Sequence, residues 1–358
     1  MNKVGSRNKS PVKNRKLGGN TVQHTAETLT LHGVVKPDLK QATDTHATVA
    51  DRENTENVTM LAEERAAPSP VFPSRWCSPR GEWQTMWEAV GGLAHRDSVP
   101  PTPCQDAAGA VNKPRPIILI ADGAGSSAVS EVGARAVVTA TLRLLDTIEH
   151  DTVAILDSVL DVDESTLNRF AKMLVKHAKG TLSDIAEIER RSIRDFRCTF
   201  LCIVLGKART IWVKVGDGAL IIERIEVATS AKSEEKLQLL PHLTILGSPG
   251  KGEFANQTTF VDDQLSVADV QWGVVDARLI TGAAVMSDGA AEKLVSHDGS
   301  RASPQISLWL EDLRQGKLRR RTLTTQFYNE NFTKGTALDD RSIALASIPL
   351  DLSVLEHR

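Results

Sequence analysis

Carboxylates that stand beside glycines, at the borders of apolar runs, are the residues of this sequence whose types and spacing could do chemistry. Two such acids follow an apolar run and precede a glycine, and two others precede an apolar run; the four are Asp106, Asp122, Asp288 and Asp339. Acids at strand ends lie at the rim of a sheet, and a neighbouring glycine lets a backbone carbonyl approach a ligand closely. The hypothesis that follows is that these distant side chains converge on one positive ligand.

A divalent cation is the ligand that such a set of acids favours. Carboxylates held at short range raise one another's pKa, and a divalent cation removes that conflict. Sites built from oxygen ligands suit Mg²⁺ or Mn²⁺. The four cysteines have no CxxC spacing and the histidines show no zinc-binding pattern, so a zinc enzyme is not expected.

Asp-Gly pairs are also common in turns, and one pair taken alone is usually structural. Asp217-Gly218 lies between two apolar runs in the manner of a hairpin, and we predict that it is only a turn. The order and spacing of the other acids, rather than any single pair, therefore carry the metal-site hypothesis.

The apolar pattern predicts two helical blocks with hairpin-linked strands between them. Helical spacing covers residues 132–146 and 163–194 in the first block, and residues 290–294 and 304–327 in the second. Strands are predicted within residues 76–90, 117–121, 198–205, 211–215, 219–223, 239–245, 257–261, 278–286 and 341–346. This order predicts an α+β fold with antiparallel sheets rather than repeated βαβ units.

The segment that ends around Asp106, residues 91–107, is predicted to be an extended or turning loop. Pro100, Pro101 and Pro103 exclude a helix there, because proline lacks the backbone donor and restricts the residue before it.

Bulk composition narrows the class of protein. The 358 residues carry a formal net charge of −2, which gives no reason to expect a nucleic acid or an anionic membrane as partner. No apolar run approaches the ~20 residues that span a bilayer, and the basic N-terminus lacks the apolar stretch of a signal peptide. With cysteines that fit reduced thiols, these features predict a cytoplasmic protein.

The N-terminal part of the chain differs from the rest in composition. Residues 1–72 are polar, begin with a basic cluster and close with prolines, so we predict a disordered tail and linker. One domain is predicted over residues 73–350, followed by a C-terminal tail at residues 351–358.

Six short motifs occur in the order in which one enzyme family carries them: Cys104-Gln105-Asp106, Ala121-Asp122-Gly123-Ala124-Gly125, Arg197-Cys198-Thr199, Val215-Gly216-Asp217, Ser287-Asp288-Gly289 and Asp339-Asp340. On these motifs, residues 76–348 resemble the metal-dependent serine/threonine phosphatases of the protein phosphatase 2C type, most closely the bacterial branch. Residues 250–260 also look like this branch. The resemblance implies a four-layer αββα sandwich of two antiparallel sheets flanked by helices, with a centre of two Mg²⁺ or Mn²⁺ ions at one end.

The resemblance also implies a role for each acid. Asp122 would bridge the two ions, the Gly123 carbonyl would ligate one of them, and Asp288 and Asp339 would bind the other. Asp106 would be a ligand or an acid directly behind the ligands. The ions would activate a water molecule that attacks a phosphoserine or phosphothreonine of a protein substrate.

Asp122 and Asp288 are thus the predicted catalytic acids, and Arg96 is the third predicted catalytic residue. The family holds the substrate phosphate with an arginine upstream of its first acid, and Arg96 is the nearest candidate. The implied activity calls for a phosphoprotein substrate and a serine/threonine kinase as opposing partner, and we expect a monomer.

Two departures from the family pattern motivate an alternative. Gln105 stands where the family often has glutamate, and no histidine follows Asp122-Gly123; a third departure, Asp340 in place of the usual asparagine, adds negative charge that raises the need for metal. A catalytically weak or inactive phosphatase fold that serves as a scaffold or binds phosphoproteins is therefore the second hypothesis.

Nucleotide binding is a third hypothesis, from a different class of enzyme. Residues 123–128 fit the pattern GxGxxA between a strand and a helix, and Asp146 lies at a suitable distance. The remaining pattern is not βαβ, which speaks against this hypothesis.

Overall fold

The computed structural model describes residues 75–76, 81–229, 237–248 and 258–349. All of them belong to one compact unit, residues 67–358. The tails predicted at residues 1–72 and 351–358 lie outside the described residues, as do Cys77 and most of segment 250–260.

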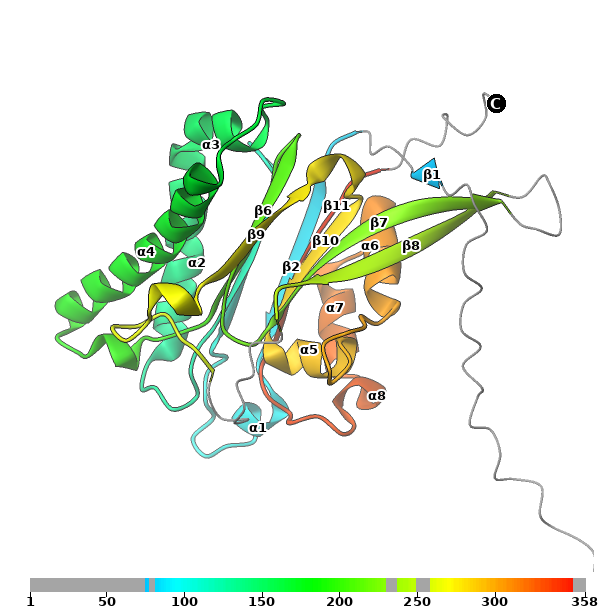
Figure 1. Cartoon of the computed structure of the whole chain (residues 1–358). Helices are drawn as coiled ribbons and strands as arrows, with labels where there is room; N and C mark the ends of the chain where they lie inside the picture. Colours follow the sequence, from blue (N-terminus) through cyan, green and yellow to red (C-terminus); the bar gives the residue numbers. More distant parts are fainter. Residues whose placement is uncertain (1–74, 77–80, 230–236, 249–257, 350–358) are drawn as a thin grey trace, which may run out of the picture. The chain divides into compact units, whose positions relative to one another are not determined.

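Two antiparallel sheets form the centre of the fold (Figure 1). The first has the order β1-β7-β10-β11-β2, with β8 paired to β7; its strands are β1 (Arg75–Trp76), β2 (Gln84–Val90), β7 (Ala219–Thr229), β8 (Leu237–Leu246), β10 (Gly282–Met286) and β11 (Arg341–Ser347). The second has the order β3-β4-β5-β6-β9; its strands are β3 (Asp106–Val111), β4 (Ile117–Asp122), β5 (Phe200–Leu205), β6 (Arg209–Val215) and β9 (Gln271–Asp276).

Strand β4 shows why the sequence folds into layers. Successive side chains of a strand point to opposite faces. Ile118 and Ile120 pack into the core between the sheets, whereas Ile117 and Leu119 pack into the core beneath helices. Because both faces are covered, the strand is apolar at every position, and this is the continuous run visible in the sequence.

Helices cover the outer face of each sheet. Against the second sheet pack α2 (Ser130–Thr147), α3 (Glu149–Leu156) and α4 (Glu164–Glu189). Against the first sheet pack α5 (Asp288–Leu294), α6 (Gln305–Arg314), α7 (Arg320–Phe327) and α8 (Glu330–Thr333). Figure 1 shows the two groups on opposite sides of the strands. The predicted four-layer αββα sandwich is confirmed.

The helix boundaries differ from the predicted ones for local reasons. The side chain of Asp163 caps α4 by accepting a hydrogen bond from the Thr166 backbone, and Arg190 in the left-handed region ends the helix before residue 194. The block predicted at residues 304–327 is two helices, with Gly316 at a φ of +68° in the connection. Helix α3 was not predicted.

Two strand predictions were wrong. Within residues 258–261 only Val261 forms an isolated bridge, to Cys198, so no strand lies there in the described part. Strand β9 was missed, and the first residues of the segment 278–286 form a short 3₁₀ turn, Ala277–Leu279.

The nucleotide-binding hypothesis also fails, because Asp146 lies within α2 and the pairings between described strands are antiparallel.

The proline-containing loop holds one helical turn that the sequence did not predict, α1 (Leu93–Arg96). The turn ends at Asp97, before the first proline, so the prolines limit its length rather than prevent it. Among the described residues, no helix combines the length and apolar character that crossing a bilayer requires.

Candidate metal centre

The sheet registers bring the separated acids to one end of the sandwich. Asp122, the last residue of β4, is paired with Asp106, the first residue of β3. Asp288 follows β10 and Asp339 precedes β11, and these two strands are antiparallel neighbours. Asp122, Asp288 and Asp339 therefore line a single pocket of about 140 Å³.

A close backbone approach holds Asp288 beside Asp339. A Cβ atom at Gly289 would lie 2.1 Å from the carbonyl oxygen of Asp340, so only glycine permits this contact. The Ser342 backbone N–H donates to Ser287 Oγ at 3.0 Å, and the Ser287 N–H donates to the Ser342 carbonyl at 3.1 Å. The glycine of this Asp-Gly pair thus serves the packing of α5 against β11.

Thr199 holds the backbone of Asp122, and the Asp122 carboxylate shares a hydrogen bond with the Asp288 carboxylate in the pocket. The Asp122 N–H donates to Thr199 Oγ1 at 2.9 Å, and its carbonyl accepts from the Thr199 N–H at 2.7 Å. The next N–H, that of Gly123, donates to the Gln105 carbonyl at 3.2 Å. Gly123 itself lines the pocket beside Asp122.

Electrostatic repulsion makes this set of acids difficult to ionise together. Burial raises the pKa of Asp122 well above its ordinary value, and the charges of Asp106 and Asp288 raise it further. Burial and the charge of Asp217 raise the pKa of Asp288. Burial, with the charge of Asp340 next, raises the pKa of Asp106 to about 8. A bound divalent cation would remove this conflict.

Asp106 lies behind the pocket rather than in its lining. The residue is 4% exposed, and neither of its carboxylate oxygens has a hydrogen-bond partner in the described part of the chain. Burying a carboxylate without a partner costs free energy. A cation bound in the neighbouring pocket would reduce this cost, which fits an acid placed directly behind a metal site.

Arg96, like Asp106, is a predicted site residue that does not line the pocket. Its guanidinium lies 5.0 Å from the centroid of the Tyr328 ring, and it is not among the residues that line the pocket. The neighbouring residue of the same helical turn, His95, occupies the pocket wall instead.

Asp217 was predicted to be only a turn, and this prediction was incomplete. It does connect β6 to β7, but its side chain lines the pocket and accepts a hydrogen bond from Thr258 Oγ1 at 2.7 Å. The signal that could have identified it was its place in the ordered motif series.

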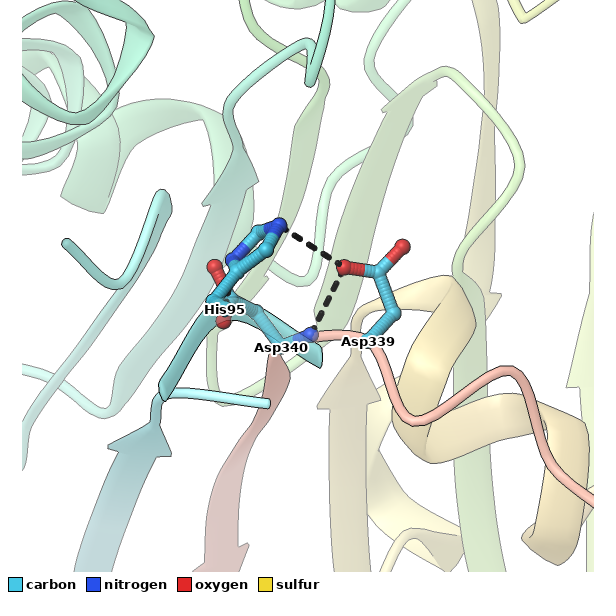
Figure 2. Close-up of side chains that lie close together, drawn as sticks. All are labelled: His95, Asp339 and Asp340. Carbon is cyan, nitrogen blue, oxygen red and sulfur yellow. Dashed lines mark hydrogen bonds and ion pairs between the residues drawn. The ribbon is translucent and has the colours of Figure 1, made fainter. Parts of the chain in front are cut away.

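Asp340, an acid where the family often has asparagine, is satisfied by three donors. Its Oδ1 accepts from the Gly92 N–H at 2.7 Å and from His95 Nδ1 at 2.9 Å, and its Oδ2 accepts from the Gln105 N–H at 2.6 Å. Figure 2 shows His95 between Asp340 and Asp339. These partners lie some 235 to 248 positions apart in sequence, so no local pattern could have revealed them.

Gln105 lines the same pocket and offers a neutral oxygen. Its Nε2 donates to Ser130 Oγ at 2.9 Å, at the start of α2, and its Oε1 is the nearest group to Gly125. Amide oxygens are acceptable ligands for hard cations, although they carry no charge.

A second, larger cavity of about 340 Å³ adjoins the first. The two share Asp217, Asp288 and Asp339, and the larger one is also lined by Lys214 and His297. Lys214 is 2% exposed, its Nζ donates to the Ser248 carbonyl at 2.7 Å, and burial lowers its pKa to about 8.

Comparisons with known proteins identify a family for the chain. The family model described as protein phosphatase 2C matches residues 92–325. The chain is 26% identical over 197 residues to serine/threonine-protein phosphatase 3 of Escherichia coli (strain K12), across 53% of this chain and 66% of that protein, just under two thirds of its length.

Two solved structures are similar at low identity. Serine/threonine phosphatase Stp1 from Staphylococcus aureus matches with a TM-score of 0.47 and 14% identity, over 76% of this chain and 98% of that chain. The catalytic domain of the phosphatase PstP, in complex with two manganese ions, matches with a TM-score of 0.46 and 15% identity, over 75% and 99%. The family model covers more than half of the chain, and the chain therefore belongs to the protein phosphatase 2C family.

Proposed function

We propose that this chain hydrolyses phosphoserine and phosphothreonine in protein substrates, using water activated by two divalent cations, Mg²⁺ or Mn²⁺. The observation that carries the proposal is the convergence of Asp122, Asp288 and Asp339 on one pocket, where the described residues offer them no lysine or arginine at ion-pair distance. Family membership supports the same reaction.

The donor set fits hard divalent ions. Four carboxylates line the pocket without being saturated by hydrogen bonds from the protein: Asp122, Asp217, Asp288 and Asp339. Four negative charges in so small a volume call for more than one divalent ion. Asp122 and the Gly123 carbonyl would hold one ion, and Asp288 and Asp339 the other.

When bound, such ions supply a nucleophile from water at neutral pH and offset the charge that develops on the phosphoryl oxygens. The protein's part is to fix the ligands in place. Thr199 holds the end of β4, and the contact of Gly289 with Asp340 holds Asp288 beside Asp339. Asp106, behind the pocket, has a pKa raised to about 8 by burial and by the charge of Asp340, and it would add negative charge once a bound cation lowers that pKa.

The adjoining cavity provides room for the phosphorylated side chain. It opens on the same acids and carries Lys214 and His297 in its wall. Ala124 follows Asp122-Gly123 and cannot donate a proton, so the leaving hydroxyl must take its proton from water or from another pocket residue. The placement of Arg96 over Tyr328 gives no support to its predicted role in phosphate binding.

The cellular setting belongs to the same proposal. We expect a cytoplasmic monomer that acts on phosphoproteins against a serine/threonine kinase. Cys104, Cys198 and Cys202 are free thiols, which fits a reducing compartment.

The test is a phosphatase assay on the purified full chain. The substrates are para-nitrophenyl phosphate and a phosphothreonine peptide, with Mn²⁺ or with EDTA, and the variants are Asp122→Asn and Asp288→Asn. We expect turnover that needs Mn²⁺ and is lost in both variants, whereas His150→Gln, an exposed histidine of α3, keeps it. A wild-type chain that binds Mn²⁺ but hydrolyses neither substrate would instead support the phosphoprotein-binding scaffold.

A further inference from the structure

One cluster at the pocket contains nitrogen as well as oxygen. His95, Asp339 and Asp340 place one ligand atom each within 4.8 Å of one another. The imidazole is 21% exposed, the Asp339 side chain is 51% exposed, and Asp340 is buried. Figure 2 shows the His95 ring facing the Asp339 carboxylate, with Asp340 on its other side.

The hydrogen bonds of Asp340 determine which nitrogen of His95 carries the proton. A carboxylate only accepts hydrogen bonds, so the contact of 2.9 Å between His95 Nδ1 and Asp340 Oδ1 requires a proton on Nδ1. Asp340 also accepts the N–H groups of Gly92 and Gln105, so each of its three described partners donates to it. In the neutral imidazole, Nε2 then carries the lone pair.

The distance from His95 Nε2 to Asp339 Oδ1 suits two ligands of one ion. The two atoms are 3.8 Å apart, too far for a hydrogen bond. Ligand atoms that each lie about 2.1 Å from an ion can be at most about 4.2 Å apart, so both can reach the same ion. A carboxylate that holds the other nitrogen of a histidine ligand is a recurrent arrangement at metal sites.

The histidine is held rigidly before any ion binds. The Ala94 N–H donates to the Leu338 carbonyl at 3.1 Å, which ties α1 to the residue before Asp339. A Cβ at Gly92 would lie 2.3 Å from the same carbonyl oxygen, so the backbone of α1 is in direct contact with this loop. The backbone contacts between α1 and Leu338 therefore fix the position of His95 relative to Asp339.

We propose that His95 Nε2 is a nitrogen ligand of the cation held by Asp339, with Asp340 as the carboxylate that orients the imidazole. The proposal rests on the proposed metal-dependent function and goes further, because it predicts a centre with mixed nitrogen and oxygen ligands. Imidazole suits transition ions better than it suits Mg²⁺. The centre should therefore prefer Mn²⁺ and Co²⁺ to Mg²⁺.

A competing role for His95 is that of a proton donor to the leaving hydroxyl. That role also uses Nε2, but it needs the doubly protonated ring and no bond to the ion. The two roles differ in what a metal spectrum shows, and the experiment is built on this difference.

The direct test is pulsed electron paramagnetic resonance on the full chain loaded with Mn²⁺. Two samples are compared, one with natural histidine and one with ¹⁵N-labelled histidine. We expect a nitrogen coupling of the ion that changes with the label. A Mn²⁺ signal without any coupling to histidine nitrogen overturns the proposal, and because the chain carries no substitution, a folding defect cannot confuse the result.

Variants then assign the nitrogen to one residue. His95→Gln should weaken the binding of Co²⁺, measured by its visible absorption and by calorimetry, by about tenfold or more, and that of Mg²⁺ by less than about twofold. His150→Gln is the matched control and should change neither affinity. Retained Co²⁺ affinity in His95→Gln with a loss of turnover would assign His95 as a proton donor and refute the proposal.

Failure of the proposed metal-dependent function can be told apart from failure of the histidine proposal. If the wild-type chain binds neither Co²⁺ nor Mn²⁺, the metal-dependent function itself is refuted, and the histidine proposal with it. If the wild-type chain binds both ions but His95→Gln binds them equally well, only the histidine proposal fails.

Discussion

Buried carboxylates occur in two different settings in this molecule. Glu223 is 1% exposed, and the Arg314 guanidinium donates to its Oε1 at 2.5 Å. Glu223 pairs with the first residue of β10, whereas Asp288 lies just beyond the other end of that strand. There, Asp122 and Asp288 have each other and Asp217 as charged neighbours. In the first setting the protein supplies the counter-charge, and in the second the described residues supply more negative charge.

This difference separates structural acids from functional ones. A second arginine, Arg115, repeats the structural pattern, since it donates to both Glu149 and Asp157. Elsewhere in the fold, buried arginines pair with acids. In the described part of the chain, no arginine pairs with the acids of the pocket. We therefore assign the missing positive charge to cations from solution.

The largest effect is expected for Asp122→Asn. Loss of a ligand of the proposed metal centre should lower Mn²⁺-dependent turnover by about 1,000-fold or more. Without metal, the variant should melt at the same temperature as the wild type or higher, because it removes a repelling charge. Activity assays and metal-free thermal melts check this. A marked drop in the melting temperature of the metal-free variant would make Asp122 a structural acid and break the comparison.

Glu223→Gln should show the opposite behaviour. Removing Glu223 from its buried ion pair leaves Arg314 with the partly exposed Glu311 as its remaining counter-charge and should cost about 2 kcal/mol of unfolding free energy. Turnover by the folded fraction should stay within about twofold, because the pair lies outside both cavities that contain the acids. Urea unfolding and kinetics below the transition measure the two quantities. Lost turnover with intact stability would contradict this assignment.

Gly92→Ala should lower both the stability of the fold and its affinity for Mn²⁺. The new Cβ would meet the Leu338 carbonyl oxygen at 2.3 Å, so α1 must move away from the loop that carries Asp339. Unfolding free energy should fall by about 1–3 kcal/mol, and Mn²⁺ should bind more weakly. Calorimetric titration follows the second change. Ala124→Gly, in the pocket wall, serves as a control for a one-methyl change and should leave Mn²⁺ affinity nearly unaltered.

The smallest effect is a dependence of metal-free stability on pH. The pKa of Asp106 is raised to about 8 in the fold, from an ordinary value of 3.8, so the folded state binds more protons than the unfolded state between these values. Stability of the metal-free chain should therefore fall as pH rises from about 4 to 8. Melting temperatures at pH 5 and pH 8, with EDTA, measure this. Added Mn²⁺ should raise the melting temperature more at pH 8 than at pH 5; equal increments would contradict the linkage.

The sequence predicted the acids better than it predicted their setting. Asp122 and Asp288 could be found because each stands at or just after the end of a strand and precedes a glycine, which is a local pattern. The α+β class with antiparallel sheets followed from the alternation of helical blocks and hairpins, whereas the order of the four layers came only from the family resemblance. Strand β9 was missed, since its side chains are only partly buried and its apolar pattern is weak.

Long-range contacts account for the rest of what was missed. The pairing of His95 with Asp340 spans 245 positions and depends on a single turn of helix in a proline-containing loop. The displacement of Arg96 onto Tyr328 depends on the same turn, because adjacent helical residues point in different directions. No spacing within the sequence encodes either contact.

The central claim, that cations from solution complete the acid pocket, is tested most directly by counting bound Mn²⁺. Equilibrium dialysis of the full wild-type chain near neutral pH, followed by elemental analysis, gives the number of ions per chain. The account predicts two ions, released by EDTA, and a reduced number in Asp122→Asn. A wild-type chain that retains no Mn²⁺ at millimolar concentration would contradict it.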